Sequence, residues 1–307
     1  MLAFPRFASA LDYPTRPVRF VVAFFAGSLS DILARTIAPS LSKRLGQEVI
    51  VDDQPGAGGN LATNIVVRAS SDGYTLLEAT SANVWNAALY DTLNFDFIRD
   101  IAPVASISRT PAVLTVTPSF PAETVPEFIS YARANPGKIN MASGGIGSLP
   151  HVAGELFKFM TGINLVHVPY RGSYLPDLLG GQVQIAFGPI PTLIEQIRAG
   201  KLRALAVTGA DTSEALPDLP TLSQFVPGYE ASAFNGVGAP KKTPTEIIYK
   251  LNAAVNAALV EDSEVQRRFA QLGTAPVSMT PGEFGKLIAD ESDKWGKVFR
   301  AAGIKAE

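Results

Sequence analysis

The chain has 307 residues, of which 47% are hydrophobic and 18% are charged, and its formal net charge is −2. This length suits two α/β domains, and the charge offers no basic surface for nucleic acid. No apolar stretch approaches the roughly 20 residues of a membrane span. Cysteine is absent and the only histidines are His151 and His167, which excludes thiolate zinc sites, cysteine nucleophiles and disulfides. We expect neither a metal nor a cofactor.

The extreme N-terminus carries information about the compartment. Ala8 and Ala10 form the small-x-small pattern that precedes signal-peptidase cleavage, but the charged and long apolar regions of a full signal peptide are missing. We interpret residues 1–12 as the tail of a signal peptide and expect a periplasmic protein. The alternative is an N-terminus without fixed structure in a cytoplasmic protein.

The first third of the chain alternates predicted strands with predicted helices. A strand at Val18–Phe24 leads into a helix at Leu29–Leu45, whose apolar residues keep helical spacing and which Gly46 ends. We also expect strands at Val49–Val51 and Thr75–Leu77, and a helix at Leu61–Ala69. This alternation predicts a parallel sheet with right-handed crossovers.

The middle of the chain repeats the alternation. The expected helices are Val125–Ala134, Val152–Met160, Leu175–Leu179 and Thr192–Ala199. The expected strands are Ile139–Ala142, Leu165–Val168, Val183–Phe187 and Ala204–Val207.

The last part of the chain no longer alternates strands with helices. The proline-rich stretch Leu216–Gly228 predicts a surface loop. It precedes helices at Thr245–Leu259, Ser263–Leu272 and Pro281–Ala302, which we expect to return and cover the first sheet.

Two interleaved α/β domains follow from this order of elements. Segments near Val113–Val116 and Phe234–Gly238 would cross between them. Domain 1 would comprise residues 13–112 plus 238–307, and domain 2 residues 113–237. Such a hinged clamshell is typical of binding proteins that close around a ligand.

Each predicted domain contains a similar strand-to-helix junction, one across residues 18–35 and the other across residues 139–151. A helix start presents unpaired backbone N–H groups and the positive end of the helix dipole. Two such ends facing each other across a cleft would hold an anion from both sides. The pattern therefore predicts a receptor for a small carboxylate.

Two motifs suggest other functions. Gly56 and Gly58 follow a strand, but Leu61 stands where a dinucleotide fingerprint needs its third glycine. Ser148 and His151 are spaced to meet on one helix face, so a Ser–His hydrolase is the alternative. The Gly-x-Ser-x-Gly elbow is absent, which favours a helix-capping or anion-binding role for Ser148. His151 would either donate into the cleft or pack within the helix.

Asp31 lies in the first turn of the first predicted helix, where the dipole favours a carboxylate. Ser28 or Ser30 would cap this helix, and Arg35 is spaced to pair with Asp31. Because a carboxylate would repel an anionic ligand, we expect Asp31 to orient the loop, accept from a ligand hydroxyl or amine, or act through water.

The chain resembles the periplasmic solute-binding receptors of tripartite tricarboxylate transporters, also called Bug-type receptors, from Tyr13 to Ala306. The matching motifs are Tyr13–Arg19, Asp31–Arg35, Pro55–Asn60, Asp72–Leu77, Asn135–Lys138, His151–Phe157, His167–Gly172 and Gly200–Val207. The resemblance implies a type II periplasmic-binding-protein fold made of two Rossmann-like α/β domains. It also implies a monomer without catalytic activity that delivers a small organic carboxylate to membrane subunits. Signalling to a sensor protein is the alternative output.

The resemblance also implies a set of ligand-binding residues. They lie in the two junctions, at the end of the third strand and along one wall of the second domain. They are Phe24, Ala26, Gly27, Ser28, Asp31, Thr80, Ser81, Asn83, Ser143, Gly144, Gly147, Ser148, His151, Tyr170 and Gly188.

The chain departs from the family pattern at several of these places. Ala23 and Ser28 replace a proline and a glycine of the first loop, and Gly188-Pro189 stand where Asp-Asn is common. Glu78 occupies a position that is usually apolar, and Trp85 follows close behind. These departures suggest the hypothesis that the ligand is a bulkier or more aromatic acid.

Overall fold

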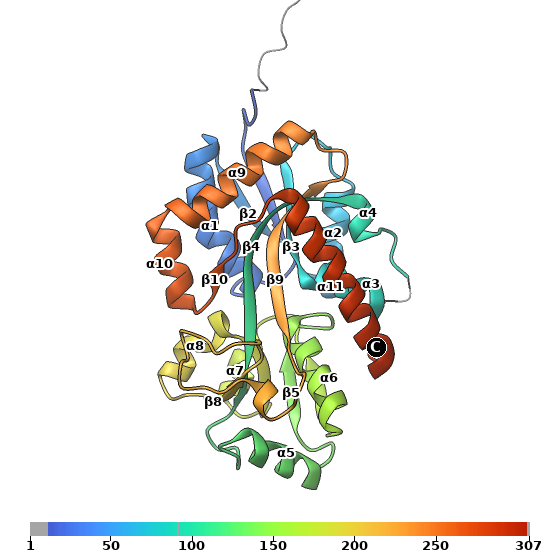
Figure 1. The fold of residues 1–307 in the computed structure, drawn as a ribbon, viewed down its shortest axis with the longest axis vertical. Coiled ribbons are helices and arrows are strands. Elements are labelled where there is room, and N and C mark those ends of the chain that lie inside the picture. The colour runs from blue at the N-terminus through green and yellow to red at the C-terminus, as the bar shows by residue number, and fades with distance from the viewer. Residues whose placement is uncertain (1–11, 91, 306–307) are drawn as a thin grey trace, which may run out of the picture.

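The computed structural model describes residues 12–90 and 92–305, so almost all of the expected signal-peptide tail lies outside the described residues. The chain folds into two lobes joined by two long strands (Figure 1). None of the helices in the described ranges is long and apolar enough to cross a membrane.

The first lobe is built on a sheet with the strand order β2-β1-β3-β9-β4. Its strands are β1 (Val18–Val22), β2 (Val49–Asp53), β3 (Thr75–Thr80), β4 (Ile101–Val116), β9 (Ser232–Pro240) and the short β10 (Ala275–Pro276). Strand β1 is parallel to β2 and β3, as the alternation predicted. Strand β9 runs antiparallel to both β3 and β4, which the alternation did not predict.

Helices surround this sheet. They are α1 (Leu29–Leu45), α2 (Asn60–Val67), α3 (Ser81–Leu89), α4 (Phe97–Asp100), α9 (Thr245–Glu261), α10 (Ser263–Leu272) and α11 (Pro281–Ala302), with a 3₁₀ turn at Ala57–Gly59. Helix α1 has the predicted bounds because Ser28 caps its start and Gly46 ends it in the left-handed conformation. Helices α3 and α4 were not predicted.

The second lobe continues from the far half of β4. Its strands are β5 (Asn140–Ser143), β6 (Val166–Pro169), β7 (Ile185–Pro189) and β8 (Arg203–Val207), and its helices are α5 (Val125–Ala134), α6 (Leu149–Thr161), α7 (Leu175–Leu179) and α8 (Ile190–Arg198). Strand β5 is parallel to β6 and β7. The stretch expected to be a surface loop contains a 3₁₀ turn at Leu222–Gln224.

Strand β4 belongs to both sheets. Its residues up to Pro111 pair with β9, and from Ala112 onward they pair with β7 and β8. The change of partner occurs where the two lobes meet. The domain boundaries expected from the sequence remain a prediction.

The final helix does more than cover the first sheet. Trp295 and Phe299 of α11 belong to the same buried apolar cluster as Phe157 and Phe187 of the second lobe. Trp85 of α3 joins this cluster, and its ring meets Trp295 edge to face with centroids 5.3 Å apart. Helices α3 and α11 therefore attach the first lobe to the core of the second, a contact that the expectation for α11 did not include.

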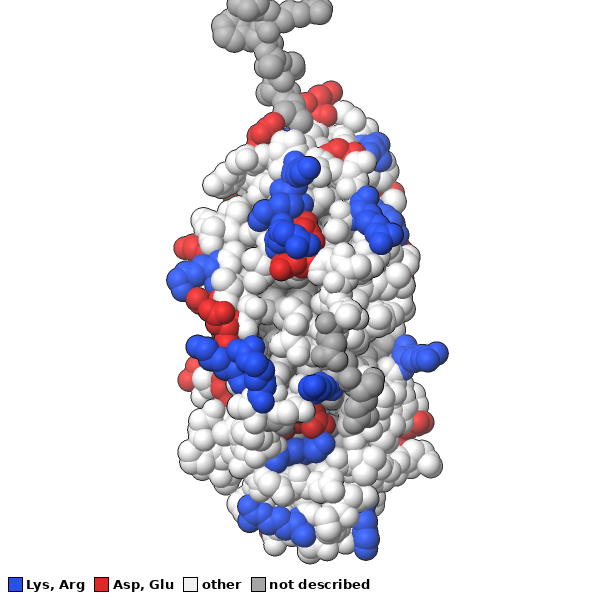
Figure 2. All heavy atoms as spheres, turned by 90° about the vertical axis from the view of Figure 1, so that its right-hand side faces the viewer, with Lys and Arg blue, Asp and Glu red and all other residues white. Residues whose placement is uncertain are grey.

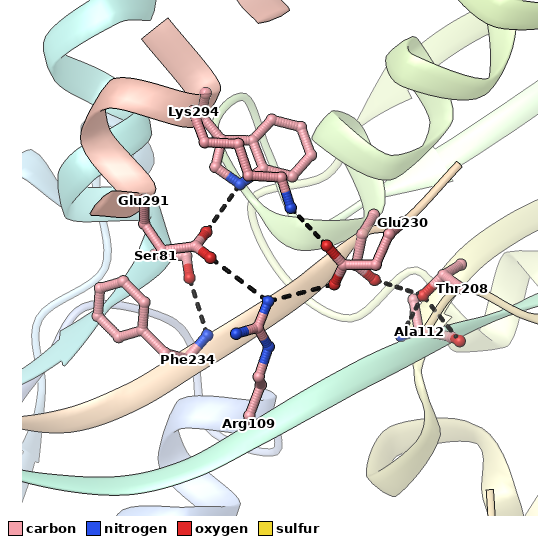
Figure 3. Close-up of polar contacts among 10 residues, drawn as sticks. Ser81, Arg109, Ala112, Thr208, Glu230, Phe234, Glu291 and Lys294 are labelled. Atoms are coloured by element: carbon pink, nitrogen blue, oxygen red, sulfur yellow. Dashed lines mark hydrogen bonds and ion pairs between the residues drawn. The ribbon is translucent and has the colours of Figure 1, made fainter. Parts of the chain in front are cut away.

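A polar cluster lies beside the crossing strands (Figure 3). Arg109 of β4 reaches Glu230 at 3.3 Å and Glu291 of α11 at 3.4 Å, and Lys294 also pairs with Glu230. The buried indole Nε1 of Trp295 donates to Glu291 at 2.8 Å. Glu291 thus connects α11 to the crossing strand on one side and to the apolar cluster on the other.

Two hydroxyl groups hold the backbone at the same crossing (Figure 3). Thr208 Oγ1 accepts from Ala112 N–H at 2.7 Å and donates to the Ala231 carbonyl at 2.6 Å. Ser81 Oγ accepts from Phe234 N–H at 2.8 Å. Thr208 satisfies buried backbone groups where β4 changes its partners, and Ser81 satisfies one just beyond the last pair of β3 with β9.

Figure 2 shows the side of the molecule on which α11 lies. Lys and Arg side chains are scattered over this face, several of them beside Asp or Glu, with uncharged areas between them.

Replacing Glu291 tests the polar cluster. Glu291→Ala leaves the buried Trp295 N–H without its acceptor, so we expect a loss of about 1–3 kcal/mol in the free energy of unfolding. Asp290→Ala is the matched control, because Asp290 lies on the same helix with a 61% exposed side chain paired to Lys286, and such pairs contribute about 0.5 kcal/mol. Urea denaturation measures both. Equal losses in the two variants would contradict the role assigned to Glu291.

Candidate functional site

A cavity of about 110 Å³ lies between the lobes, where the strand-to-helix junctions of both lobes converge. Strand β9 contributes Ala233 and Asn235 to its lining, so one of the strands that joins the lobes also borders the cavity. Six of the predicted ligand-binding residues line it: Phe24, Gly27, Ser28, Thr80, Gly144 and Ser148.

The first junction presents the start of α1 to the cavity. Leu29 and Ser30, the first two residues of the helix, both line it. Their N–H groups precede the first intrahelical hydrogen bonds and lie at the positive end of the dipole. Ser28 caps the helix by accepting from Asp31 N–H at 3.3 Å.

Asp31 stabilises this loop from behind. Its carboxylate accepts from Gly27 N–H at 2.7 Å and from Arg35 Nε, the pairing predicted from their spacing. The side chain is buried and is not among the cavity-lining residues. These contacts favour the loop-orienting role among those expected for Asp31. Ala26, at the tip of the loop, is exposed.

The second junction presents the start of α6. Ser148 is at the N-cap position, but its hydroxyl donates to the Gly145 carbonyl at 2.6 Å and makes no capping bond to the helix. Helix α6 begins at Leu149, earlier than expected, which places His151 in its first turn. Gly144 and Ser148 line the cavity opposite the first junction.

The two lobes touch around the cavity. A Cβ on Gly147 would lie 2.3 Å from Asn86 Oδ1 of α3, and one on Gly58 would lie 2.6 Å from the Ile146 carbonyl. Gly147 and Gly58 also have positive φ values of 81° and 62°, a conformation that glycine adopts without strain. Only glycine therefore permits this approach of the lobes.

The cavity wall is mostly apolar. Its aromatic and aliphatic residues were not among the predicted ligand-binding residues; they include Trp85, Phe25, Leu29, Leu149, Pro150, Leu175 and Leu193. The available sequence signal for such a wall was the presence of apolar residues next to the glycines and serines of both junctions. Such a lining favours a ligand with a hydrocarbon body.

Three buried polar atoms belong to residues of this wall. Trp85 Nε1, Tyr174 Oη and Asn235 Oδ1 have no hydrogen-bond partner within the described part of the chain. Burying an unpaired polar atom is costly, so such atoms mark places where a ligand or water completes the bonding.

Several predicted residues lie behind the lining and fix its shape. Asn83 accepts from Thr80 N–H in a capping box that starts α3, and its amide donates to Thr63 of α2 at 2.8 Å. Ser81 holds β9, as described above. Tyr170 donates its hydroxyl to Asp177 at 2.7 Å.

Gly188 also lies behind the wall. A Cβ at this position would meet Tyr174 Oη at 2.5 Å and Leu193 at 2.3 Å. The missing side chain thus allows Tyr174 and Leu193 to form the wall themselves.

A histidine pair lies behind the second junction. The His151 and His167 rings are 4.3 Å apart. His151 Nδ1 accepts from Gly147 N–H at 3.2 Å, and His167 Nε2 lies 2.6 Å from Ser143 Oγ. Burial lowers the pKa of His151 to about 3 and that of His167 to about 4, with the neighbouring His167 and Lys158 adding to the shift of His151. Both rings are neutral at pH 7.

Ser148 and His151 do not form the catalytic dyad that their spacing suggested as the alternative. Among the described residues no hydrogen bond joins Ser148 to His151, because the Ser148 hydroxyl and His151 Nδ1 are each bonded to the loop backbone. In the same residues, no group of three His, Asp or Glu side chains is placed to hold a metal ion.

Known proteins resemble this chain in sequence and in fold. A family model described as "Tripartite tricarboxylate transporter family receptor" matches residues 33–304. BugT of Bordetella pertussis is 36% identical over 302 residues, which cover 97% of this chain and 92% of that protein. The structure of R. palustris Rpa4515 with adipate is 39% identical, with a TM-score of 0.92, and covers 96% of this chain and 99% of that one. That of the periplasmic binding protein BugD is 32% identical, with a TM-score of 0.92, and covers 96% and 100%.

The histidine pair predicts a pH-dependent stability. Because the pKa of each ring is lower in the folded than in the unfolded chain, their contribution is complete above about pH 6.5 and is lost as the pH falls toward 4. The slope reaches about 1.4 kcal/mol per pH unit for the buried His151 and is smaller for the half-buried His167.

The double variant His151→Asn/His167→Gln keeps an acceptor for Gly147 N–H and a partner for Ser143. Denaturation at pH 7.5, 6.0 and 4.5 should show a smaller loss of stability in this variant than in the original protein. The chain has no other histidines, so the difference isolates this pair, and parallel profiles would refute the assignment.

Proposed function

Since the chain belongs to the family of tripartite tricarboxylate transporter receptors, we propose that it binds a dicarboxylate with a hydrocarbon body and delivers it to the membrane subunits of such a transporter. Members of this family are solute-binding proteins and not enzymes. The chain is accordingly a receptor for an organic carboxylate.

The meeting of two helix N-termini at one cavity carries this proposal. Ser28 and Ser30 of the first lobe and Gly144 and Ser148 of the second bring backbone N–H groups and hydroxyls to the same space. Such groups bind carboxylates without a cationic side chain. An anion held there contacts both lobes, and a ligand shifts the equilibrium toward the closed form only if it binds that form better than the open one.

The remainder of the cavity accommodates the rest of the ligand. Phe25, Trp85, Leu149 and Leu193 offer apolar contacts, while Tyr174 and Asn235 offer polar atoms from outside the two junction sequences. An acid with methylene groups between two carboxylates matches this distribution. The related Rpa4515 was solved with adipate, an acid of this kind. Because an apolar wall also suits an aromatic ring, the test below includes aromatic acids.

The proposal also covers the cellular compartment and the oligomeric state of the chain. The relative BugD is a periplasmic binding protein, and we propose the periplasm as the compartment of this chain. We further propose that it acts as a monomer that closes around its ligand.

A thermal-shift panel tests the proposed ligand class. Residues 11–307 are titrated with succinate, glutarate, adipate and pimelate, with malate and citrate, and with benzoate and phthalate. A ligand at 100 times its Kd adds about 2.7 kcal/mol, which raises Tm by roughly 5–10 °C. We expect the straight-chain dicarboxylates to give the largest shifts. Protein unfolded and refolded before the titration serves as the control for retained ligand, and shifts confined to aromatic acids would refute the dicarboxylate assignment.

Gly147→Ala tests closure. The new methyl group would collide with Asn86 and would strain a backbone with positive φ, so we expect the Kd for adipate to rise at least about tenfold, or 1.4 kcal/mol. Gly162→Ala is the matched control, because Gly162 has a φ of 68° and nothing within 4 Å of the added Cβ. It should lose stability but keep its affinity. Calorimetric titration that finds equal affinities in the two variants would contradict closure through Gly147.

A further inference from the structure

The two junctions hold their loops in the same way. In the first, the N–H of Gly27 donates to the Asp31 carboxylate at 2.7 Å. In the second, the N–H of Gly147 donates to His151 Nδ1 at 3.2 Å. Each glycine lies two residues before its helix, and each acceptor is the third residue of that helix. His151 therefore occupies in α6 the place that Asp31 occupies in α1.

The backbone around these contacts is also alike in the two junctions. Both helices begin at a leucine that follows an N-cap serine. The N–H of Ser28 donates to the Phe25 carbonyl at 3.0 Å, and that of Ser148 donates to the Gly145 carbonyl at 3.2 Å. The two glycines that donate to Asp31 and His151 have φ values of 83° and 81°, a conformation that glycine adopts without strain. The two loops therefore follow similar turns.

The loop of the second junction is rich in glycine. Residues 144–148 include three glycines, and glycine loses more conformational freedom on folding than any other residue. Two residues of this loop, Gly144 and Ser148, line the cavity. A binding loop that is ordered before the ligand arrives lowers the entropic cost of binding. A contact that fixes this loop therefore affects how strongly the cavity binds a ligand.

The same loop also approaches the first lobe. A Cβ on Gly144 would lie 3.4 Å from Phe25 of the first junction, and one on Gly147 would lie 2.3 Å from Asn86 of α3. These approaches leave little room for the loop to move while the lobes are in contact. The contact that holds Gly147 therefore matters for closure as well as for the cavity.

The His151 ring is suited to accept this hydrogen bond. A backbone N–H only donates, so Nδ1 is the unprotonated nitrogen and the neutral ring carries its proton on Nε2. The residue is 4% exposed, and burial lowers the pKa of His151 to about 3, which keeps Nδ1 able to accept at neutral pH. His151 is not among the cavity-lining residues. Its ring therefore acts on a ligand through the loop.

His167 of β6 supports this ring and holds the beginning of the loop. The rings of His167 and His151 are 4.3 Å apart. His167 Nε2 lies 2.6 Å from Ser143 Oγ, which also accepts from the Gly145 N–H at 3.1 Å. Strand pairing places His167 there, because it lies opposite Met141 of β5, and Ser143 is on the same face of β5 as Met141. The two rings therefore hold the loop at both of its ends.

We propose that His151 is a positioning residue for ligand binding: its Nδ1 holds the Gly147 N–H, so that the loop of the second junction is fixed before the ligand arrives. This inference rests on the proposed function and identifies a residue behind the proposed site that controls its affinity. An acceptor at position 151 is then required for tight binding, whereas an aromatic ring alone is not sufficient.

Two substitutions separate the acceptor from the ring. His151→Phe keeps an aromatic ring without an acceptor, so the Kd for adipate, measured by calorimetry at pH 7.5, should rise about tenfold. His151→Asn offers Oδ1 in place of Nδ1, so its Kd should stay within about twofold of the original value. Gly162→Ala, at the other end of α6, is the control for lost stability and should keep its affinity. Equal Kd values in His151→Phe and His151→Asn would overturn the inference.

A ligand-free measurement separates this inference from the proposed function. The ¹⁵N spectrum of the imidazole rings shows which nitrogen carries the proton, and the signals of His151 are identified by their loss in His151→Asn. We expect the proton on Nε2, and a proton on Nδ1 overturns the inference. Hydrogen exchange of the Gly147 amide should be at least about tenfold faster in His151→Phe than in the original protein, and equal rates also overturn it. Absence of adipate binding in every variant contradicts adipate as a ligand, and the ligand-free results then decide the role of His151.

Discussion

The antiparallel pairing of β4 with β9 is the constraint on which the arrangement of the two lobes depends. The pairing runs from Ile101 to Pro111 of β4, after which β4 exchanges β9 for β7 and β8. Because of this exchange, the second sheet continues beyond the end of the first. The strand-to-helix junctions of both lobes then border the same cavity. Asn235, near the crossing, lines the cavity. A ligand bound in this cavity, as proposed, would contact the strand that joins the lobes as well as the junctions.

The proposed recognition by helix ends would allow one architecture to bind different acids. The groups around the proposed carboxylate position are backbone N–H groups and hydroxyls, which any carboxylate can use. Selectivity then depends on the residues around the rest of the ligand. In this chain those residues are a wall of aromatic and aliphatic side chains with a few unpaired polar atoms. Because Gly188 has no side chain, Tyr174 and Leu193 have room to form part of the wall.

Local signals predicted much of the fold. Helices α1, α5, α10 and α11 have the predicted bounds. Their N-caps, C-terminal glycines and apolar spacing depend only on residues that are close together in the sequence. Helix α3 was missed because its capping box uses Asn83 where glutamate or glutamine is the usual signal. Prolines 103 and 111 concealed the length of β4, since proline inside a run argues against a central strand.

The site was only partly predictable for a different reason. Both junctions were visible as local patterns, and Ser28, Gly144 and Ser148 line the cavity as expected from the resemblance. Tyr174 and Asn235 lie far from the junctions in sequence, and only the exchange of strand partners brings them to the cavity. Tyr170 was expected in the wall, but its hydroxyl is bonded to Asp177, a contact that spacing alone does not predict.

The edge-to-face contact of Trp85 with Trp295 has an optical consequence. These are the only two tryptophans of the chain; both are 1% exposed, and one of them lines the cavity. Indole emission responds to its surroundings and to energy transfer between neighbouring rings. Trp85 lines the cavity and both rings belong to the apolar cluster shared with the second lobe, so a ligand in the cavity or a shift between the lobes would change their emission. The molecule thus contains its own label-free reporter, with no other tryptophan to contribute background.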